Sequence, residues 1–461
     1  MTNRSLPPAA TRSMRRAFVL PLLLAAALPS PAAAQSAPAG PVSELSGELR
    51  RLGDSELLGV YAARGYRPVW LTPAGALAPG AERVAELVET AAIDGADPTE
   101  LPVAELSSAL EQLRREATPA ARVRAELALS RAFVDYVRAM RRAPAAAMTY
   151  EHASLRPNVP RRADALWAAA SAASLDDYVS NMRWMHPLYA PLRRAALVDG
   201  GDMAGIDPAV RTNLARIRAL PALGKGRTIL VDAATATLWM YEGNRAVDSM
   251  RVVVGKPTLQ TPMLAGYVRY AILNPYWNVP QDLVRANIAP NVLRRGVGYL
   301  KASGYEVLSG WGSDAAPIEA AKVDWRQIAR GDGELRVRQL PGDGNFMGEV
   351  KFEFPNPLGI YLHDTPDKHL LREDQRQFSS GCIRLEDAQR LGRWLMQGPL
   401  QAASDAPEQR IDLPEIVPIY VTYLTVRPEA GRLAFGPDPY DRDGVSRALA
   451  QSQADTGSLV R

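Results

Sequence analysis

The spacing of apolar residues in this chain changes at Gly226. Upstream, apolar residues recur every three or four positions between charged faces, which is typical of amphipathic helices. Downstream, short runs of β-branched and aromatic residues lie between turn signals, which is typical of strands. The clearest helical segments are 43–58, 81–92, 101–117 and 120–141, and the clearest strands are 227–232, 237–241 and 247–254, with a hairpin signal at 242–244. The pattern predicts an α+β chain, with a mostly helical domain over 42–221 and a β-rich, sandwich-like domain over 226–445.

The N-terminus has the pattern of a processing segment. Arg12, Arg15 and Arg16 precede an apolar stretch at 17–28, and three alanines follow at 32–34. The apolar stretch is too short to span a bilayer comfortably, and no cysteine lies near the cleavage site to carry a lipid. We expect a cleaved signal over 1–34, a linker over 35–41, export to the periplasm and no transmembrane anchor after cleavage. Small polar residues at the other end predict a flexible tail over 446–461.

Composition argues against several classes of protein. The hydrophobic content of 47% and charged content of 23% exclude wholesale disorder. The 54 Lys and Arg residues are interspersed with 50 Asp and Glu residues, for a net charge of +4, and they form no basic stripe for nucleic acid. The four histidines are scattered without metal-ligand spacing, and there is no glycine-rich phosphate loop. We therefore expect no metal and no cofactor.

Residues 281–348 interrupt the strand pattern of the β-rich domain. An irregular insertion of this size inside a sheet domain usually forms a lid or a binding surface. We expect this insertion to cap a groove. The aromatic residues Tyr276 and Trp277, just before it, could line a substrate channel or could pack the insertion against the sheet.

Cys382 is the only cysteine in the 461 residues, so it cannot form an internal disulfide. It is a buried bystander, an intermolecular bridge or a nucleophile. The small residues at 379–381 leave the approach to its sulfur open, and we expect a helix over 385–396. A cysteine just before a helix N-terminus has a lowered pKa. His363 lies nineteen positions earlier, at the end of an expected strand, and is the candidate base.

The segments Tyr361-Leu362-His363-Asp364 and Ser379-Ser380-Gly381-Cys382-Ile383-Arg384 resemble the catalytic signature of the YkuD-type L,D-transpeptidases. The family's serine, glycine, cysteine and arginine fall on Ser379, Gly381, Cys382 and Arg384. Ser380 stands where many members carry a second histidine, and Asp364 stands where many carry glycine. The resemblance extends to the long periplasmic members, which have an N-terminal scaffold domain and a capping insertion. These relatives often insert a small peptidoglycan-binding module, for which residues 193–212 leave too little room, so we interpret 193–212 as a linker and expect the module to be missing.

The resemblance implies an enzyme of cell-wall biogenesis that forms 3→3 cross-links between peptidoglycan stem peptides. The donor is a tetrapeptide stem, the acceptor is the diaminopimelate amine of a second stem, and carbapenems act as covalent inhibitors. Cys382 would be the nucleophile and His363 the general base and acid, with a backbone carbonyl orienting the imidazole. We expect the backbone N–H groups of Gly381 and Cys382 to bind the oxyanion, with Ser379 and Ser380 supporting the loop. Expected substrate contacts are Arg384, Tyr361, Tyr276 and Trp277, although Arg384 could equally form a structural ion pair.

Two alternatives remain open from the sequence. The same pair of residues could transfer the acyl group to water, as an L,D-carboxypeptidase or cross-link hydrolase, or to a lipoprotein lysine. The bulk of the insertion favours a second stem over water. An alternative of another class is a non-catalytic wall-binding scaffold protein, against which the intact His363 and Cys382 argue.

Overall fold

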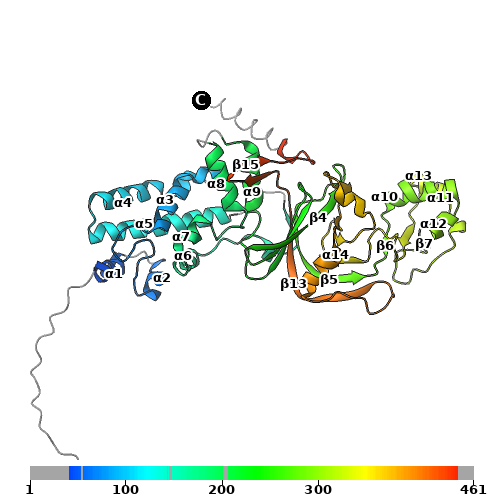
Figure 1. Cartoon of the computed structure of the whole chain (residues 1–461), viewed down its shortest axis with the longest axis horizontal. Helices are drawn as coiled ribbons and strands as arrows, with labels where there is room; N and C mark the ends of the chain where they lie inside the picture. The colour runs from blue at the N-terminus through cyan, green and yellow to red at the C-terminus, as the bar shows by residue number, and fades with distance from the viewer. Residues whose placement is uncertain (1–40, 53–55, 143, 145–147, 201–205, 445–461) are drawn as a thin grey trace, which may run out of the picture. The chain divides into compact units, whose positions relative to one another are not determined.

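The computed structural model describes residues 41–52, 56–142, 144, 148–200 and 206–444. The expected signal over 1–34 and the expected tail over 446–461 lie outside the described residues, as does nearly all of the expected linker. In the helical half, the chain runs through α1 (Pro41–Leu52), α2 (Leu58–Ala63), α3 (Pro79–Glu89), α4 (Val103–Arg115), α5 (Pro119–Arg141), α6 (Arg162–Ala170), α7 (Leu175–Ser180), α8 (Tyr189–Gly200) and α9 (Pro208–Arg218). Figure 1 shows these helices in blue to green.

Helix α5 is the central element of the helical half. Thr118 and Pro119 form its N-terminal start signal. The Thr118 side chain accepts a hydrogen bond from the Ala121 N–H, and Pro119 occupies the first turn. Phe133 of this helix packs against Trp70 and Trp184, at ring-centroid distances of 5.1 and 5.3 Å. Helices α1, α3, α4 and α6 pack around α5, so the helical pattern of the sequence builds one apolar core.

The interpretation of residues 193–212 as a linker is wrong. The segment continues α8 and, from Pro208, begins α9, which Asp207 caps by accepting the Ala209 N–H. Arg193 is buried in α8, and its Nε lies 2.9 Å from Asp94 Oδ1. Asp94 also accepts hydrogen bonds from the hydroxyls of Tyr136 and Tyr189. The buried Asp94 carboxylate, with three donors, thus joins this segment to the helical core. The length of the segment, on which the linker interpretation was based, gave no sign of this contact.

The β-rich half forms a sheet that closes on itself. The strand order is β5-β13-β2-β3-β4-β12-β10-β9, and β9 pairs with both β10 and β5. The expected sandwich-like domain is thus a closed sheet. Its apolar interior is the second core of the chain. The strands are β2 (Arg227–Asp232), β3 (Thr237–Glu242), β4 (Arg245–Gly255), β5 (Leu264–Leu273), β9 (Val350–Glu353), β10 (Leu362–His363), β12 (Ile383–Leu385) and β13 (Gln409–Thr422), with β1 (Thr149–Tyr150) beside β5 and β11 (Gln377–Ser379) beside β4.

The expected helix over 385–396 starts later than the sequence indicates. Residues Ile383–Leu385 form β12, in which Ile383 and Leu385 are buried in the core. The helix, α14 (Ala388–Met396), begins after Asp387, whose side chain accepts the Arg390 N–H. Cys382 therefore precedes a strand and does not lie at a helix N-terminus.

The insertion is a folded lobe, which we define as residues 277–348. Its strands β6 (Trp277–Asn278), β8 (Arg336–Gln339) and β7 (Tyr305–Leu308) pair in that order, so the lobe begins four residues before the expected boundary. A core of its own lies beneath them and includes the buried Trp325. The lobe also contains α10 (Gln281–Leu283), the π-helical turn η4 (Val284–Ile288), α11 (Ala289–Arg295), α12 (Gly298–Ala302) and α13 (Trp325–Arg330), drawn in yellow-green in Figure 1.

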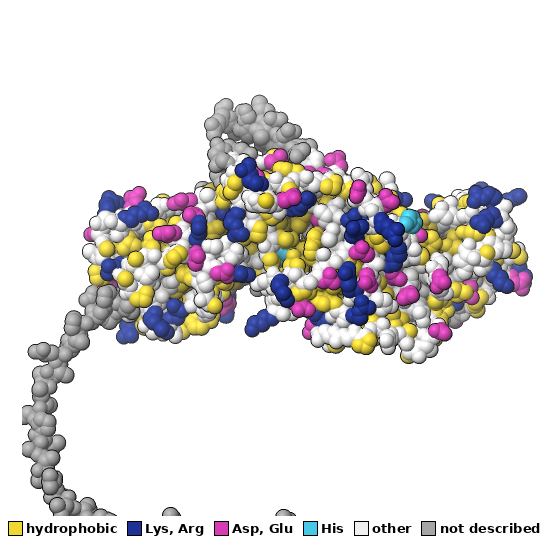
Figure 2. All heavy atoms as spheres, in the orientation of Figure 1, with side chains coloured by type: hydrophobic (Ala, Val, Ile, Leu, Met, Phe, Trp, Pro, Cys, Tyr) yellow, Lys and Arg dark blue, Asp and Glu magenta, His cyan; other side chains and the backbone are white. Residues whose placement is uncertain are grey.

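After β13 the chain forms the hairpin of β14 (Val426–Glu429) and β15 (Arg432–Phe435), which contacts α8 and α9. On the face drawn in Figure 2, acidic side chains lie among the basic ones, as their interspersion in the sequence predicts. No helix within the described ranges is long and apolar enough to cross a membrane.

The ion pair of Arg193 with Asp94 generates a stability prediction. We expect Arg193→Met to lower the free energy of unfolding by about 3 to 5 kcal/mol, because it leaves a buried carboxylate without its charge partner. Arg194→Met is the matched control, since the neighbouring side chain is exposed, and we expect it to change stability by less than about 0.5 kcal/mol. Urea denaturation followed by circular dichroism measures both. Equal losses in the two variants would contradict this account of the core.

Candidate active site

Strand pairing brings His363 and Cys382 together. Strands β10 and β12 run parallel, with Leu362 opposite Ile383 and His363 opposite Arg384. Because successive side chains point to opposite faces of a strand, Leu362 and Ile383 enter the core, where both are fully buried. His363, Arg384 and Cys382 lie on the other face and line one cavity of about 360 Å³.

This cavity, which we call the cysteine cavity, contains most of the residues singled out from the sequence. Tyr276, Trp277, Tyr361, His363, Ser379, Ser380, Cys382 and Arg384 all line it. Gly381 is not part of this lining. The lobe contributes further residues, including Leu283, Phe346 and Met347. This lining agrees with the expectation that the insertion caps a groove.

A backbone carbonyl orients His363. Its Nδ1 lies 2.6 Å from the carbonyl oxygen of Asp364, which can only accept, so Nδ1 carries the proton and Nε2 is left as an acceptor. Burial and the nearby charge of Arg384 lower the pKa of His363 to about 4. The imidazole is therefore neutral at neutral pH. The family resemblance implied a backbone carbonyl for this task but did not identify which one.

The thiol of Cys382 is neutral as well. Burial raises its pKa, although a backbone hydrogen bond from Tyr361 and the charge of Arg384 act in the opposite direction. The expected lowering of this pKa is wrong, because it assumed a helix from residue 385, whereas α14 begins at Ala388, six residues after Cys382. The sulfur lies 3.7 Å from the carbonyl oxygen of Gly359, which can accept the thiol proton at rest.

The loop before Cys382 is held by two hydroxyl groups. Ser379 Oγ accepts the Gly381 N–H at 3.1 Å and donates to the Cys382 carbonyl at 2.6 Å. Thr261 Oγ1 donates to the Gly381 carbonyl at 2.7 Å. Gly381 has a φ of +114°, a conformation that favours glycine. The expectation that the Gly381 N–H binds an oxyanion is corrected here, because Ser379 already takes that hydrogen bond; the N–H of Cys382 is the remaining candidate.

Arg384 connects the cysteine cavity with a second one. Its Nη1 lies 3.2 Å from Asp367 Oδ2, while its buried Nε has no hydrogen-bond partner among the described residues. The second cavity has a volume of about 770 Å³ and shares Trp277, Leu283, Phe346, Ser380 and Arg384 with the first. We call it the lobe cavity, because most of its lining comes from the lobe.

Two further residues of this region were not identified as site residues from the sequence. Lys256, in the loop after β4, lines the lobe cavity with an exposed side chain. Thr261 is fully buried and supports the cysteine loop. The residues from Gly255 to Pro262 are typical of a loop, but nothing in that local pattern indicates that the loop meets residues 379–382, more than a hundred positions away. Across the described ranges, no group of three or more His, Cys, Asp or Glu side chains is arranged to hold a metal ion.

Comparison with known proteins agrees with this arrangement. A family model described as the L,D-transpeptidase catalytic domain, YkuD, matches residues 226–402, and a model described as the Scaffold domain matches residues 55–195. A protein of Haemophilus influenzae named "Putative L,D-transpeptidase" is 26% identical over 287 residues, which are 60% of this chain and 57% of the relative. The match thus spans little more than half the length of that relative.

Solved structures were also found, at low similarity. An L,D-transpeptidase from Mycobacterium smegmatis is 13% identical over 42% of this chain and 59% of its own, with a TM-score of 0.22. The catalytic domain from an E. faecium L,D-transpeptidase is 15% identical over 43% of this chain and 98% of its own, with a TM-score of 0.19. TM-scores this low add nothing to the argument. The two family models thus identify a YkuD-type L,D-transpeptidase catalytic domain over residues 226–402, which follows a scaffold domain over residues 55–195.

Proposed function

We propose that this protein is a peptidoglycan L,D-transpeptidase that forms 3→3 cross-links through a thioester on Cys382, in the periplasm. The observation that carries the proposal is that His363 and Cys382 face the same cavity from adjacent parallel strands. A nucleophile and a base within one pocket, with the base held in one tautomer, are the elements of covalent acyl transfer.

The first half-reaction acylates the cysteine. Nε2 of His363 takes the thiol proton as the sulfur attacks the carbonyl carbon at the L-centre of the third stem residue, diaminopimelate. The N–H of Cys382 donates a hydrogen bond to the oxyanion that forms. The C–N bond to the terminal D-alanine then breaks, the imidazolium protonates the leaving amine, and a thioester remains. Because both groups start neutral, the proton moves during the attack and no ion pair needs to exist beforehand.

The second half-reaction transfers the acyl group to an amine. The side-chain amine of a second stem attacks the thioester, His363 accepts the proton released from that amine, and the cysteine leaves and is reprotonated. The lobe cavity adjoins the cysteine cavity and is large enough for a peptide, which favours a stem as acceptor over water. Lys256 and Arg384 are the cationic residues of its lining, and they suit the carboxylates of such a stem.

Product analysis tests the proposal. Incubation of the full chain with disaccharide-tetrapeptide should release D-alanine and give a dimer linked between the third residues, and the Cys382→Ala variant should give neither. Tripeptide without dimer would identify a carboxypeptidase, and transfer only to a lipoprotein lysine would identify an anchoring enzyme; either result would overturn the cross-linking function. An inert wild-type chain would favour the wall-binding scaffold protein.

The low pKa of His363 generates a pH prediction. Acylation requires the neutral imidazole, so the second-order rate constant for acylation by a carbapenem should stay level from pH 7 to about 5 and fall with a midpoint near 4. Stopped-flow fluorescence measures the rate. A midpoint near the ordinary histidine value of about 6.5 would contradict the buried, neutral base.

The lowered pKa of His363 also makes the stability of the folded protein depend on pH. In the unfolded chain His363 binds a proton near pH 6.5, whereas in the folded chain it does so near 4. Its contribution to folding is complete above about 6.5 and is lost as the pH falls toward 4. Circular dichroism at each pH should therefore confirm that the protein is folded during the rate measurement.

The position of Lys256 predicts a change in only one half-reaction. Lys256→Met should leave donor acylation unchanged and raise the KM for the acceptor stem by about two- to fivefold, the range expected for an exposed ion pair. Lys225→Met is the matched control, an exposed lysine that lies just before β2. Acylation and aminolysis are followed separately by mass spectrometry and by dimer formation. An unchanged acceptor KM, or an equal loss in both half-reactions, would show that Lys256 does not bind the acceptor.

A further inference from the structure

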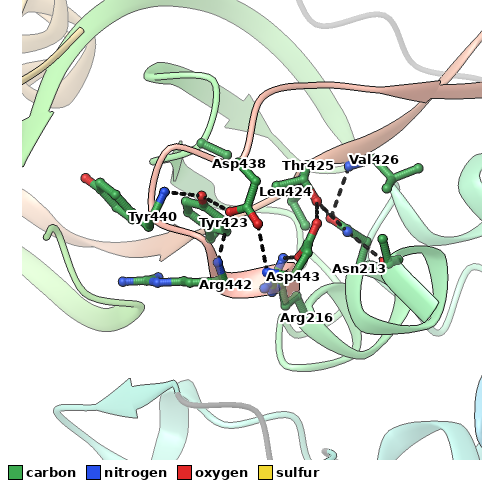
Figure 3. Close-up of polar contacts among 12 residues, drawn as sticks. Asn213, Arg216, Tyr423, Leu424, Thr425, Val426, Asp438, Tyr440, Arg442 and Asp443 are labelled. Carbon is green, nitrogen blue, oxygen red and sulfur yellow. Dashed lines mark hydrogen bonds and ion pairs between the residues drawn. The ribbon is translucent and has the colours of Figure 1, made fainter. Parts of the chain in front are cut away.

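A continuous polar network begins on helix α9 of the helical half. Asn213 is fully buried, and its Nδ2 donates to Thr425 Oγ1 at 2.8 Å while its Oδ1 accepts the Thr425 N–H at 2.8 Å. One turn later, Arg216 Nη1 lies 2.7 Å from Asp443 Oδ1, and both side chains are less than one tenth exposed. Thr425 also donates to Asp443. Figure 3 shows these four residues converging where α9 meets the segment after β13.

The segment that follows β15 carries the network onward. Asp438 accepts the N–H groups of Arg442 and Asp443, at 3.0 and 2.8 Å, which folds the segment into a tight loop. The hydroxyl of Tyr423 donates to Asp438 and accepts the Tyr440 N–H at 2.9 Å. The rings of Tyr423 and Tyr440 stack at 5.2 Å (Figure 3). Tyr440 is thereby fixed in both its backbone and its ring.

The hydroxyl of Tyr440 reaches the loop that supports the cysteine. It donates to the Gly255 carbonyl at 2.6 Å and accepts the Thr261 N–H at 3.3 Å. Arg442 adds hydrogen bonds to the Thr261 carbonyl and to Gln260 Oε1. The Thr261 hydroxyl then donates to the Gly381 carbonyl at 2.7 Å. The network thus ends on the residue just before Cys382.

The last hydrogen bond orients a catalytic group. The carbonyl of Gly381 and the N–H of Cys382 belong to the same peptide unit, which is planar and trans, so the two groups point in opposite directions. Holding the carbonyl therefore fixes the direction of the N–H. At φ +114°, Gly381 has no side chain to restrict this peptide, so the restraint has to come from Thr261 and from Ser379.

We propose that Tyr440 and Arg216 are positioning residues that aim the Cys382 N–H at the oxyanion, through Thr261 and the Gly381 carbonyl. Helix α9 thereby supports the transition state of a reaction in the β-rich half. The inference rests on the proposed function, because it assumes acylation of Cys382.

Two reactions of the same thiol test the inference. Acylation by a carbapenem develops an oxyanion, whereas alkylation by iodoacetamide does not. Tyr440→Phe keeps the ring and removes the hydroxyl. The acylation rate constant at saturating carbapenem should therefore fall at least about tenfold. Complete loss of an oxyanion donor lowers the rate about a hundredfold or more, and a misdirected donor should lose part of that effect. Its carbapenem Kd and alkylation rate should match those of the wild type. Tyr420→Phe is the matched control, because it removes another buried hydroxyl, which bonds to the Leu155 carbonyl at 3.1 Å.

The far end of the network is tested separately. Arg216→Met should lower acylation in the same selective way, and Arg216→Lys should restore much of it. The inference fails if folded Tyr440→Phe acylates at the wild-type rate, if alkylation falls as much as acylation, or if Tyr420→Phe loses as much as Tyr440→Phe. A wild-type chain that alkylates but never acylates would instead overturn the proposed function.

Discussion

The parallel pairing of β10 with β12 is the constraint on which the candidate site depends. Each strand is only two or three residues long. β10 places Leu362 in the core, β12 places Ile383 and Leu385 there, and the neighbouring side chains lie on the opposite face. Burial of Leu362 and Ile383 therefore sets the register that brings His363 and Cys382 to one cavity. A slip of either strand by one residue would turn its functional side chain away from the cavity. The packing of the core and the geometry of the site are consequences of the same pairing.

Burial also sets the charge state of the site. Removing water disfavours the imidazolium and the thiolate alike, so the pKa of His363 falls and that of Cys382 rises. Arg384 favours the thiolate but disfavours the imidazolium, so its charge does not create an ion pair at rest. The resulting neutral pair differs from the activated thiolate that a helix N-terminus would provide. In the proposed mechanism, the reaction then depends on how well the loop around Cys382 presents its hydrogen-bond donor. Ser379 and Thr261 hold this loop.

The sequence predicted the features that follow from local patterns. The change of period at Gly226, the hairpin at Gly243 and the position of His363 at a strand end are confirmed, because each depends on a few adjacent residues. The helix expected over 385–396 is present, but its predicted start was three residues too early. Ile383 and Leu385 fit a buried strand as well as a helix, and pairing with β4 and β10 decided between them. The support of Gly381 by Thr261 and Tyr440 could not be predicted, since it joins three segments that are distant in the chain.

The central claim is that Cys382 is an accessible acylating nucleophile. Intact-protein mass spectrometry of the wild-type chain and of Cys382→Ala, each incubated with a carbapenem, tests it most directly. The account predicts a single covalent adduct on the wild type and none on Cys382→Ala. An unmodified wild type, or an adduct that persists without the cysteine, would contradict it.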